Sequence, residues 1–150
     1  MLVTEVIEVP RSVEESFAYV ADFTTVAEWD PGIHASRKVS GDGGIGTVYE
    51  VQAEFRGKTM PFTYTVTAFE AGRRIVLDGV GEKATSLDTV AFEPAGDGST
   101  RITYTADFEL KGVLRVAEPF LGGTFRTLAR KALAGLAEKL GAGAAPSTAA

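Results

Sequence analysis

The chain has 150 residues, 45% of them hydrophobic and 23% charged, which are the proportions of one soluble domain with a single hydrophobic core. The absence of cysteine excludes disulfides, thiolate catalysis and cysteine-ligated zinc, and a formal net charge of −5 disfavours binding to nucleic acid. Because the sequence shows neither a signal-peptide pattern nor the roughly 20 consecutive apolar residues of a membrane span, we expect a cytoplasmic protein without membrane insertion.

The N-terminal residues predict a strand followed by a helix. Polar and apolar residues alternate over residues 2–9, which is typical of a half-buried strand, and Pro10 ends the alternation. Ser12 and Glu15 have the spacing of a capping box, and apolar residues follow at helical spacing. We therefore expect a short amphipathic helix that ends near Asp22.

A second helical turn is expected directly afterwards. Thr24 or Thr25 can cap this turn, which includes Trp29. Pro31 disfavours helix at the residue before it, so Asp30 and Pro31 end the turn. Two short helices thus follow the first strand.

The pattern changes to a period of two over residues 33–110. Turn-rich sites interrupt the alternation at residues 41–44, 56–58, 71–73, 79–81 and 96–98. These breaks divide the segment into about six strands. Their connections are too short for crossover helices, so the strands must form an antiparallel meander, which makes a sheet of about seven strands with the first one.

One face of this sheet is predicted to be apolar and the other polar. Tyr49, Val51 and Phe55 share one side of their strand, whereas Glu50 and Glu54 share the other. The apolar side of two further strands consists of Met60, Phe62, Tyr64 and Val66, and of Ile102, Tyr104, Ala106 and Phe108. Such an apolar face must be buried against another element of the fold.

The last predicted element can pack against this apolar face. Residues 113–140 predict a long amphipathic helix whose apolar stripe consists of Leu121, Phe125, Leu128, Ala132 and Leu136. Pro119 and the two glycines at 122–123 should kink or break the helix. The small and polar residues 142–150 predict a disordered tail, which leaves one domain over residues 1–141.

The order of these elements resembles the α+β helix-grip fold of the START and Bet v 1-like (SRPBCC) superfamily, in which a curved antiparallel sheet wraps a long C-terminal helix. Four segments are similar to its bacterial polyketide cyclase/dehydrase and lipid-transport group: VPRSVEESF at residues 9–17, WDPG at 29–32, GIGT at 44–47 and FEP at 92–94. The resemblance covers nearly the whole chain. It implies a cavity between sheet and helix that receives lipids, polyketides or other apolar molecules.

Asp88 is the most informative polar position. It shares one side of its strand with Ser86 and Phe92, so it points inward if Phe92 does. A carboxyl on the apolar face would have a raised pKa because of desolvation, and could serve as acid, base or ligand acceptor. The opposite register, with Leu87 and Ala91 inward, would place Asp88 in water.

His34 is the only histidine and therefore the natural candidate for a general base near neutral pH. Its polar neighbours Ser36 and Lys38 favour a position that faces solvent. A single histidine excludes a multi-histidine metal site, and we expect no metal. The G-x-G-x-x-G string at residues 41–46 precedes a strand rather than a helix, so we also expect no dinucleotide cofactor.

Trp29 has two interpretations. Its ring can stack on a ligand at one end of the implied cavity, or it can fill the core while its indole N–H finds a backbone partner. The second interpretation is favoured. Asp30 is interpreted as a turn-forming residue before Pro31.

Three functions are compatible with the sequence. The favoured one is noncatalytic binding or carriage of a small hydrophobic molecule by a monomer or homodimer without a cofactor. The alternative is an enzyme of the polyketide cyclase, aromatase or dehydratase type, with proton carriers drawn from Asp88, Tyr49, Tyr64, Tyr104 and His34. The third is a protein-interaction module whose cavity is filled by side chains. The residues expected to contact a ligand are Trp29, Tyr49, Val51, Phe55, Phe62, Tyr64, Val66, Asp88, Val90, Tyr104, Ala106, Phe120, Phe125 and Leu128.

Overall fold

The structure is a computed structural model that describes residues 1–141, and the tail expected at 142–150 lies outside the described residues. The elements are β1 (Leu2–Val9), α1 (Val13–Ala21), the 3-10 turn η1 (Phe23–Thr25), α2 (Val26–Trp29), β2 (Ile33–Ser40), β3 (Val48–Phe55), β4 (Lys58–Glu70), β5 (Arg74–Gly81), β6 (Ala84–Pro94), β7 (Thr100–Leu110), the 3-10 segment η2 (Gly112–Ala117) and α3 (Glu118–Lys139). Their order confirms the predicted sequence of one strand, two short helices, a meander and a long helix.

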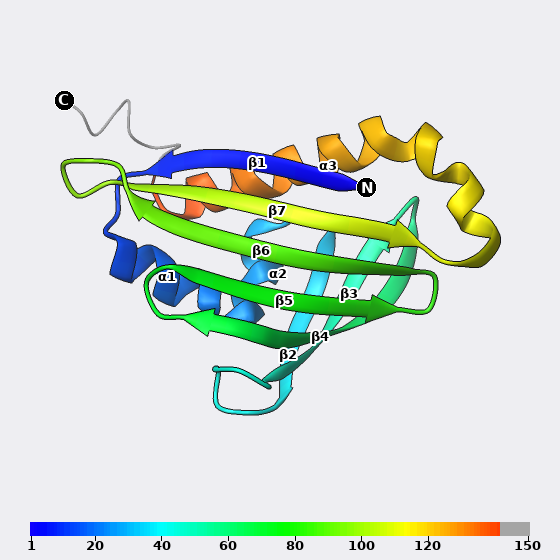
Figure 1. The fold of residues 1–150 in the computed structure, drawn as a ribbon, viewed down its shortest axis with the longest axis horizontal. Coiled ribbons are helices and arrows are strands. Elements are labelled where there is room, and N and C mark those ends of the chain that lie inside the picture. Colours follow the sequence, from blue (N-terminus) through cyan, green and yellow to red (C-terminus); the bar gives the residue numbers. More distant parts are fainter. Residues whose placement is uncertain (142–150) are drawn as a thin grey trace.

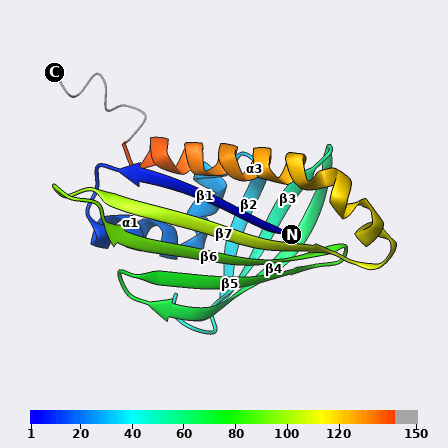
Figure 2. The same ribbon diagram turned by 45° about the horizontal axis from the view of Figure 1, so that its top comes forward.

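The seven strands form one antiparallel sheet in the order β1-β7-β6-β5-β4-β3-β2. The sheet curves so strongly that β2 and β3 cross behind β5, β6 and β7 (Figures 1 and 2). Helix α3 lies along β1 and also contacts α2. This arrangement is the helix-grip fold that the sequence predicted.

One predicted turn is wrong. Residues 79–81 belong to β5, and the chain turns at residues 82–83 instead. The glycine at 79 leaves space for a neighbouring ring, because a Cβ atom there would lie 2.4 Å from the ring of Tyr64 on β4. Gly79 therefore serves cross-strand packing, which a sequence pattern does not distinguish from a turn signal.

The helix caps agree with the sequence in one case and differ in the other. The Ser12 hydroxyl accepts a hydrogen bond from the Glu15 backbone N–H at 3.1 Å, as the capping box predicts. The second cap is Asp22, whose carboxylate accepts from the backbone N–H of Thr24 at 3.1 Å. Thr25 donates its hydroxyl to the carbonyl of Tyr19 at 2.9 Å, so this hydroxyl does not cap α2.

The predicted C-terminal helix is divided in two. Residues 112–117 form η2, and α3 begins at Glu118 with Pro119 in its first turn, where the missing N–H breaks no helical hydrogen bond. The predicted break near Pro119 is thus confirmed, whereas the glycines at 122–123 lie within a continuous helix. Farther along, α3 approaches α2 so closely that a Cβ at Gly135 would lie 2.0 Å from the carbonyl oxygen of Trp29.

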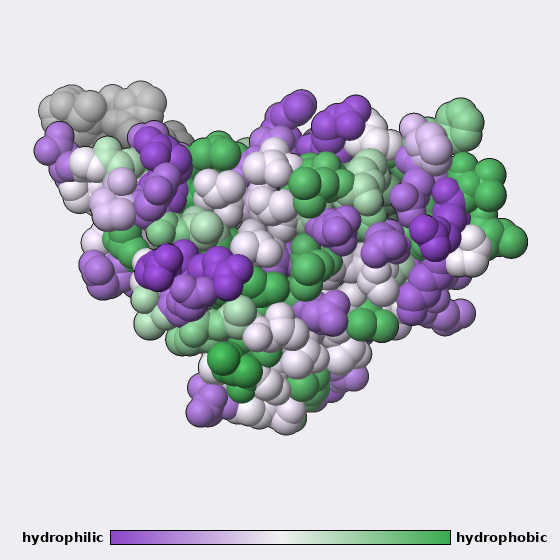
Figure 3. Space-filling model, in the orientation of Figure 1, coloured by the Kyte–Doolittle hydropathy of each residue, from purple (hydrophilic) through white to green (hydrophobic). Residues whose placement is uncertain are grey.

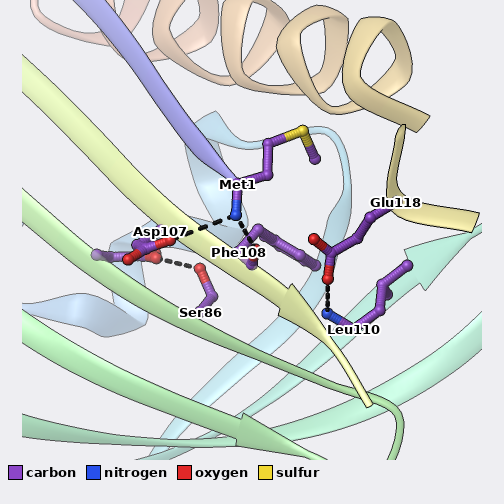
Figure 4. A network of polar contacts seen from close by, with 7 residues as sticks. Met1, Ser86, Asp107, Phe108, Leu110 and Glu118 are labelled. Carbon is purple, nitrogen blue, oxygen red and sulfur yellow. Dashed lines mark hydrogen bonds and ion pairs between the residues drawn. The ribbon is translucent and has the colours of Figure 1, made fainter. Parts of the chain in front are cut away.

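Polar contacts fix the end of β7 near the N-terminus and α3 (Figure 4). The terminal ammonium of Met1 donates to the carbonyl oxygen of Phe108 at 2.6 Å. The Glu118 carboxylate accepts from the backbone N–H of Leu110 at 2.8 Å, which holds the start of α3 against the sheet. None of the helices within residues 1–141 is long and apolar enough to cross a membrane.

Candidate functional site

A cavity of about 610 Å³ lies between the sheet and α3. Its wall is mainly apolar and includes side chains from α2, from the strands of the sheet and from α3. Representative members are Trp29, Phe55, Phe62, Val90, Ala106 and Phe125. A volume of this size lies within the range of about 300–1,000 Å³ found for small-molecule sites.

The cavity has a charged mouth at the end of the molecule where the β3–β4 turn, the β5–β6 turn and η2 lie (Figure 1). The mouth residues, all exposed, are Glu54, Arg56, Lys58, Glu82 and Lys83. Apolar side chains of η2 and early α3 are also exposed beside it, and Figure 3 shows the apolar surface at this end. The cavity wall therefore meets the protein surface at this end.

A polar cluster interrupts the apolar wall away from the mouth. The Asp88 side chain is 5% exposed, and it accepts hydrogen bonds from the hydroxyls of Ser86 and Tyr104. The Tyr104 bond, from the phenol oxygen to Oδ2, measures 3.0 Å. Leu87 is 44% exposed on the other side of β6, so the register is the one that turns Asp88 inward. We call Ser86, Asp88, Tyr104 and the nearby Tyr64 the polar cluster.

Burial dominates the electrostatics of the polar cluster. Desolvation raises the pKa of Asp88 to about 6, although hydrogen bonds from Ser86 and Tyr104 act in the opposite direction and the charge of Asp30 adds to the rise. Burial, followed by the Asp88 charge, raises the pKa of Tyr64 and of Tyr104 well above that of a free phenol. The two tyrosines therefore stay neutral, and Asp88 titrates near pH 6.

Asp30 is a site residue that the sequence analysis missed. Its Oδ1 accepts the backbone N–H of Gly32 at 2.8 Å, which confirms the predicted turn. The same side chain also borders the cavity, and desolvation raises its pKa to about 6. An aspartate before Pro31 is already explained as a turn-forming residue. The sequence therefore gave no separate sign that Asp30 also borders a cavity.

Trp29 agrees in part with each of the two interpretations, as a core residue and as a residue at the cavity. It is 5% exposed and belongs to the core, but it also borders the cavity. Its indole N–H is buried and has no hydrogen-bond partner among residues 1–141. The backbone partner that the core interpretation requires is therefore not present in the described part of the chain.

Most of the residues expected to contact a ligand border the cavity. These are Trp29, Phe55, Phe62, Tyr64, Asp88, Val90, Tyr104, Ala106, Phe125 and Leu128. Three others, Tyr49, Val51 and Val66, are buried in the core of the described structure rather than in the cavity wall. Phe23 packs its ring edge-on against Tyr49 with centroids 5.7 Å apart, so part of the apolar face is covered by the N-terminal helical segment and not by α3.

Phe120 and His34 lie outside the cavity wall. Phe120 is 85% exposed, whereas its neighbour Leu121, a member of the predicted apolar stripe, borders the cavity. His34 is half exposed on β2, where its Nε2 contacts the carboxylate of Glu54. The histidine is thus on the solvent side, as its neighbours predicted.

The site has an apolar wall suited to an apolar molecule, and its polar cluster has a group able to take up and release a proton near neutral pH. Asp88 offers a carboxyl that titrates near neutral pH beside neutral phenols, which are weak acids. Among the described residues, no three His, Asp or Glu side chains come together in a group that could hold a metal ion. The polar cluster itself offers hydrogen bonding and proton transfer.

The curved sheet, the long helix and the cavity between them define a protein of the helix-grip fold class. More specifically, the chain belongs to the polyketide cyclase/dehydrase and lipid transport family, whose profile matches residues 2–141. A comparison with curated proteins finds no match.

Solved structures share this fold at low sequence identity. The Zhui aromatase/cyclase from Streptomyces sp. R1128 superposes with a TM-score of 0.81 at 12% identity, covering 93% of both chains. The protein TTHA0849 from Thermus thermophilus has a TM-score of 0.81 at 17% identity, covering 93% of this chain and 97% of its own. A START superfamily protein from Mycobacterium smegmatis has a TM-score of 0.73 at 22% identity, covering 98% of both. At these identities the likeness shows the fold alone.

Proposed function

We propose that this protein binds a small hydrophobic molecule, lipid-like or polyketide-like, in the cavity between the sheet and α3. The observation that carries the proposal is the cavity itself, about 610 Å³ with a predominantly apolar wall. Burial of apolar surface gains about 25 cal/mol per Å², so a ligand that fills such a space is bound without any charged contact. The family description, which includes lipid transport, supports the same function.

The site also favours a second candidate, an enzyme of the cyclase, aromatase or dehydratase type. The supporting observation is Asp88, a buried carboxyl with a pKa raised to about 6 by desolvation and with a hydrogen bond from Tyr104. In this role ionised Asp88 accepts a proton from a carbon acid, and a phenol donates one to the oxygen that becomes negative. An Asp88→Asn variant separates the candidates, because a carrier keeps its binding of a neutral apolar probe and an enzyme loses its turnover.

The third possibility, an interaction module with a cavity filled by side chains, gains no support from an open volume of about 610 Å³. A cytoplasmic location and a monomeric or homodimeric state remain part of the proposal. The expected absence of a cofactor belongs to it as well, since binding by burial needs none.

The proposed function is tested by filling the cavity. Ala106 borders the cavity and pairs with Asp88 across β6 and β7, so Ala106→Phe places a ring in the binding volume. The matched control is Ala91→Phe, which adds the same ring on the other side of β6 from Val90. Fluorescence titration with the neutral probe 1-pyrenemethanol should show at least tenfold weaker binding for Ala106→Phe and unchanged binding for the control. Equal affinities for both variants and the wild type would refute binding in this cavity.

A further inference from the structure

Within residues 1–141, the inner part of the cavity wall contains acidic groups but no basic one. Seven charged residues of the described chain border the cavity, and the five at the mouth are exposed. The other two, Asp30 and Asp88, are both carboxyls. Helix α3 adds no charge, because the residues it presents to the cavity are Leu121, Phe125, Leu128, Ala129 and Ala132.

These two carboxyls have hydrogen bonds but no counterion in the described part of the chain. Asp88 accepts from two neutral hydroxyls, and Asp30 accepts from the backbone N–H of Gly32. None of the ion pairs formed within residues 1–141 includes either aspartate. A buried carboxylate is costly unless a cation pairs with it, and two that face one cavity also repel each other.

An aromatic ring borders the same region of the cavity. Trp29 directly precedes Asp30, is 5% exposed and lines the cavity. A cation that lies over the face of an indole ring is attracted by it. Trp29 therefore adds a second feature that favours a cationic group near Asp30.

We propose that the ligand is an apolar amine, whose ammonium group lies between Asp88 and Asp30 and whose apolar part lies along Phe62, Val90 and Phe125. This inference rests on the proposed function and specifies the chemical class of its ligand. An ammonium supplies the missing counterion and can donate to the carboxylate oxygens that face the cavity. The basic residues Arg56, Lys58 and Lys83 outnumber the acidic ones at the mouth, so the mouth itself gives no preference for a cation.

The proposal predicts how binding depends on pH. The groups around the two carboxyls are Ser86, Tyr64 and Tyr104, and burial keeps the pKa of both phenols far above neutral, so only the aspartates change charge between pH 5 and 7.5. An ammonium binds the ionised carboxylates and displaces their protons. Amine affinity should therefore rise across this range, whereas the affinity of a neutral analogue should not.

The test compares three fluorescent probes that share one apolar ring system. They are 1-pyrenemethylamine, which is cationic, 1-pyrenemethanol, which is neutral, and 1-pyreneacetate, which is anionic. At pH 7.5 the amine should bind the wild type at least tenfold more tightly than the alcohol, and the anion should bind most weakly. Asp88→Asn should remove most of the amine preference while alcohol binding persists, which also shows that the variant is folded.

Two further variants sharpen the test. Asp30→Asn keeps an acceptor for Gly32 and should reduce the amine preference independently of Asp88. Asp78→Asn removes an exposed carboxylate from β5 and should leave the preference unchanged. Equal binding of amine and alcohol, or a preference that survives both cavity variants, would overturn the ligand class while the cavity would still bind apolar molecules. If neither the amine nor the alcohol binds, the proposed function itself fails.

Discussion

Replacing Asp88 with asparagine should change how protein stability depends on pH. Desolvation raises the pKa of Asp88 from an ordinary value of 3.8 to about 6. A carboxyl with a raised pKa favours the folded state when it is protonated, and this stabilisation is complete below the unfolded pKa and lost as pH rises through the folded one. A difference of about 2 pKa units at 1.36 kcal/mol per unit corresponds to about 3 kcal/mol in total.

About 2 kcal/mol of this stabilisation should disappear between pH 4.5 and 7.5, because part of it is already lost at pH 4.5. The amide introduced by Asp88→Asn does not titrate and resembles the protonated acid, so the variant should lack this loss. Urea denaturation of ligand-free protein at several pH values measures the free energy of unfolding of both proteins. Between pH 4.5 and 7.5, the free energy of unfolding of the variant should rise by about 2 kcal/mol relative to that of the wild type. Asp78→Asn is the control for an exposed carboxylate, and parallel curves for Asp88→Asn and the wild type would refute the reasoning.

Three further substitutions test the packing and the caps. Gly79→Ala should destabilise the protein by about 1–3 kcal/mol, because its Cβ would lie 2.4 Å from the ring of Tyr64, and an unchanged urea midpoint would contradict this. Gly135→Ala should destabilise by a similar amount of about 1–3 kcal/mol, since its Cβ would meet the Trp29 carbonyl oxygen at 2.0 Å; a stabilised variant would show that α3 lies farther from α2. Ser12→Ala should cost about 1 kcal/mol through loss of the helix cap, measured by thermal unfolding, and no change in Tm would argue against that cap.

The fold could be predicted because its signals are local. Alternation over each strand, the capping box at Ser12 and short connections each restrict the chain, and together they leave an antiparallel meander covered by a helix. The same alternation placed Asp88 on the side of Phe92, which the structure shows to be the inner side. Such period-two arguments work when a strand is regular over most of its length.

The details of the site depend on contacts between distant segments, which the sequence does not show. Tyr49 has the alternation of a cavity residue, but Phe23 covers it, and that contact requires the packed structure. Phe120 was expected at the cavity but lies beside the apolar stripe of α3, whose member Leu121 borders the cavity instead. Asp30 was explained by its turn, so its position at the cavity became visible only when α2 was placed beside the sheet.

The central claim, an occupied apolar cavity, is tested most directly by native mass spectrometry of the protein purified from the organism that encodes it. The sample is measured before and after denaturation with organic extraction. We expect a reproducible additional mass of small-molecule size that disappears on extraction and that is absent from Ala106→Phe. A protein mass without any adduct, which also fails to shift with fatty acids, sterol-like compounds, polyketides and apolar amines, would contradict the account.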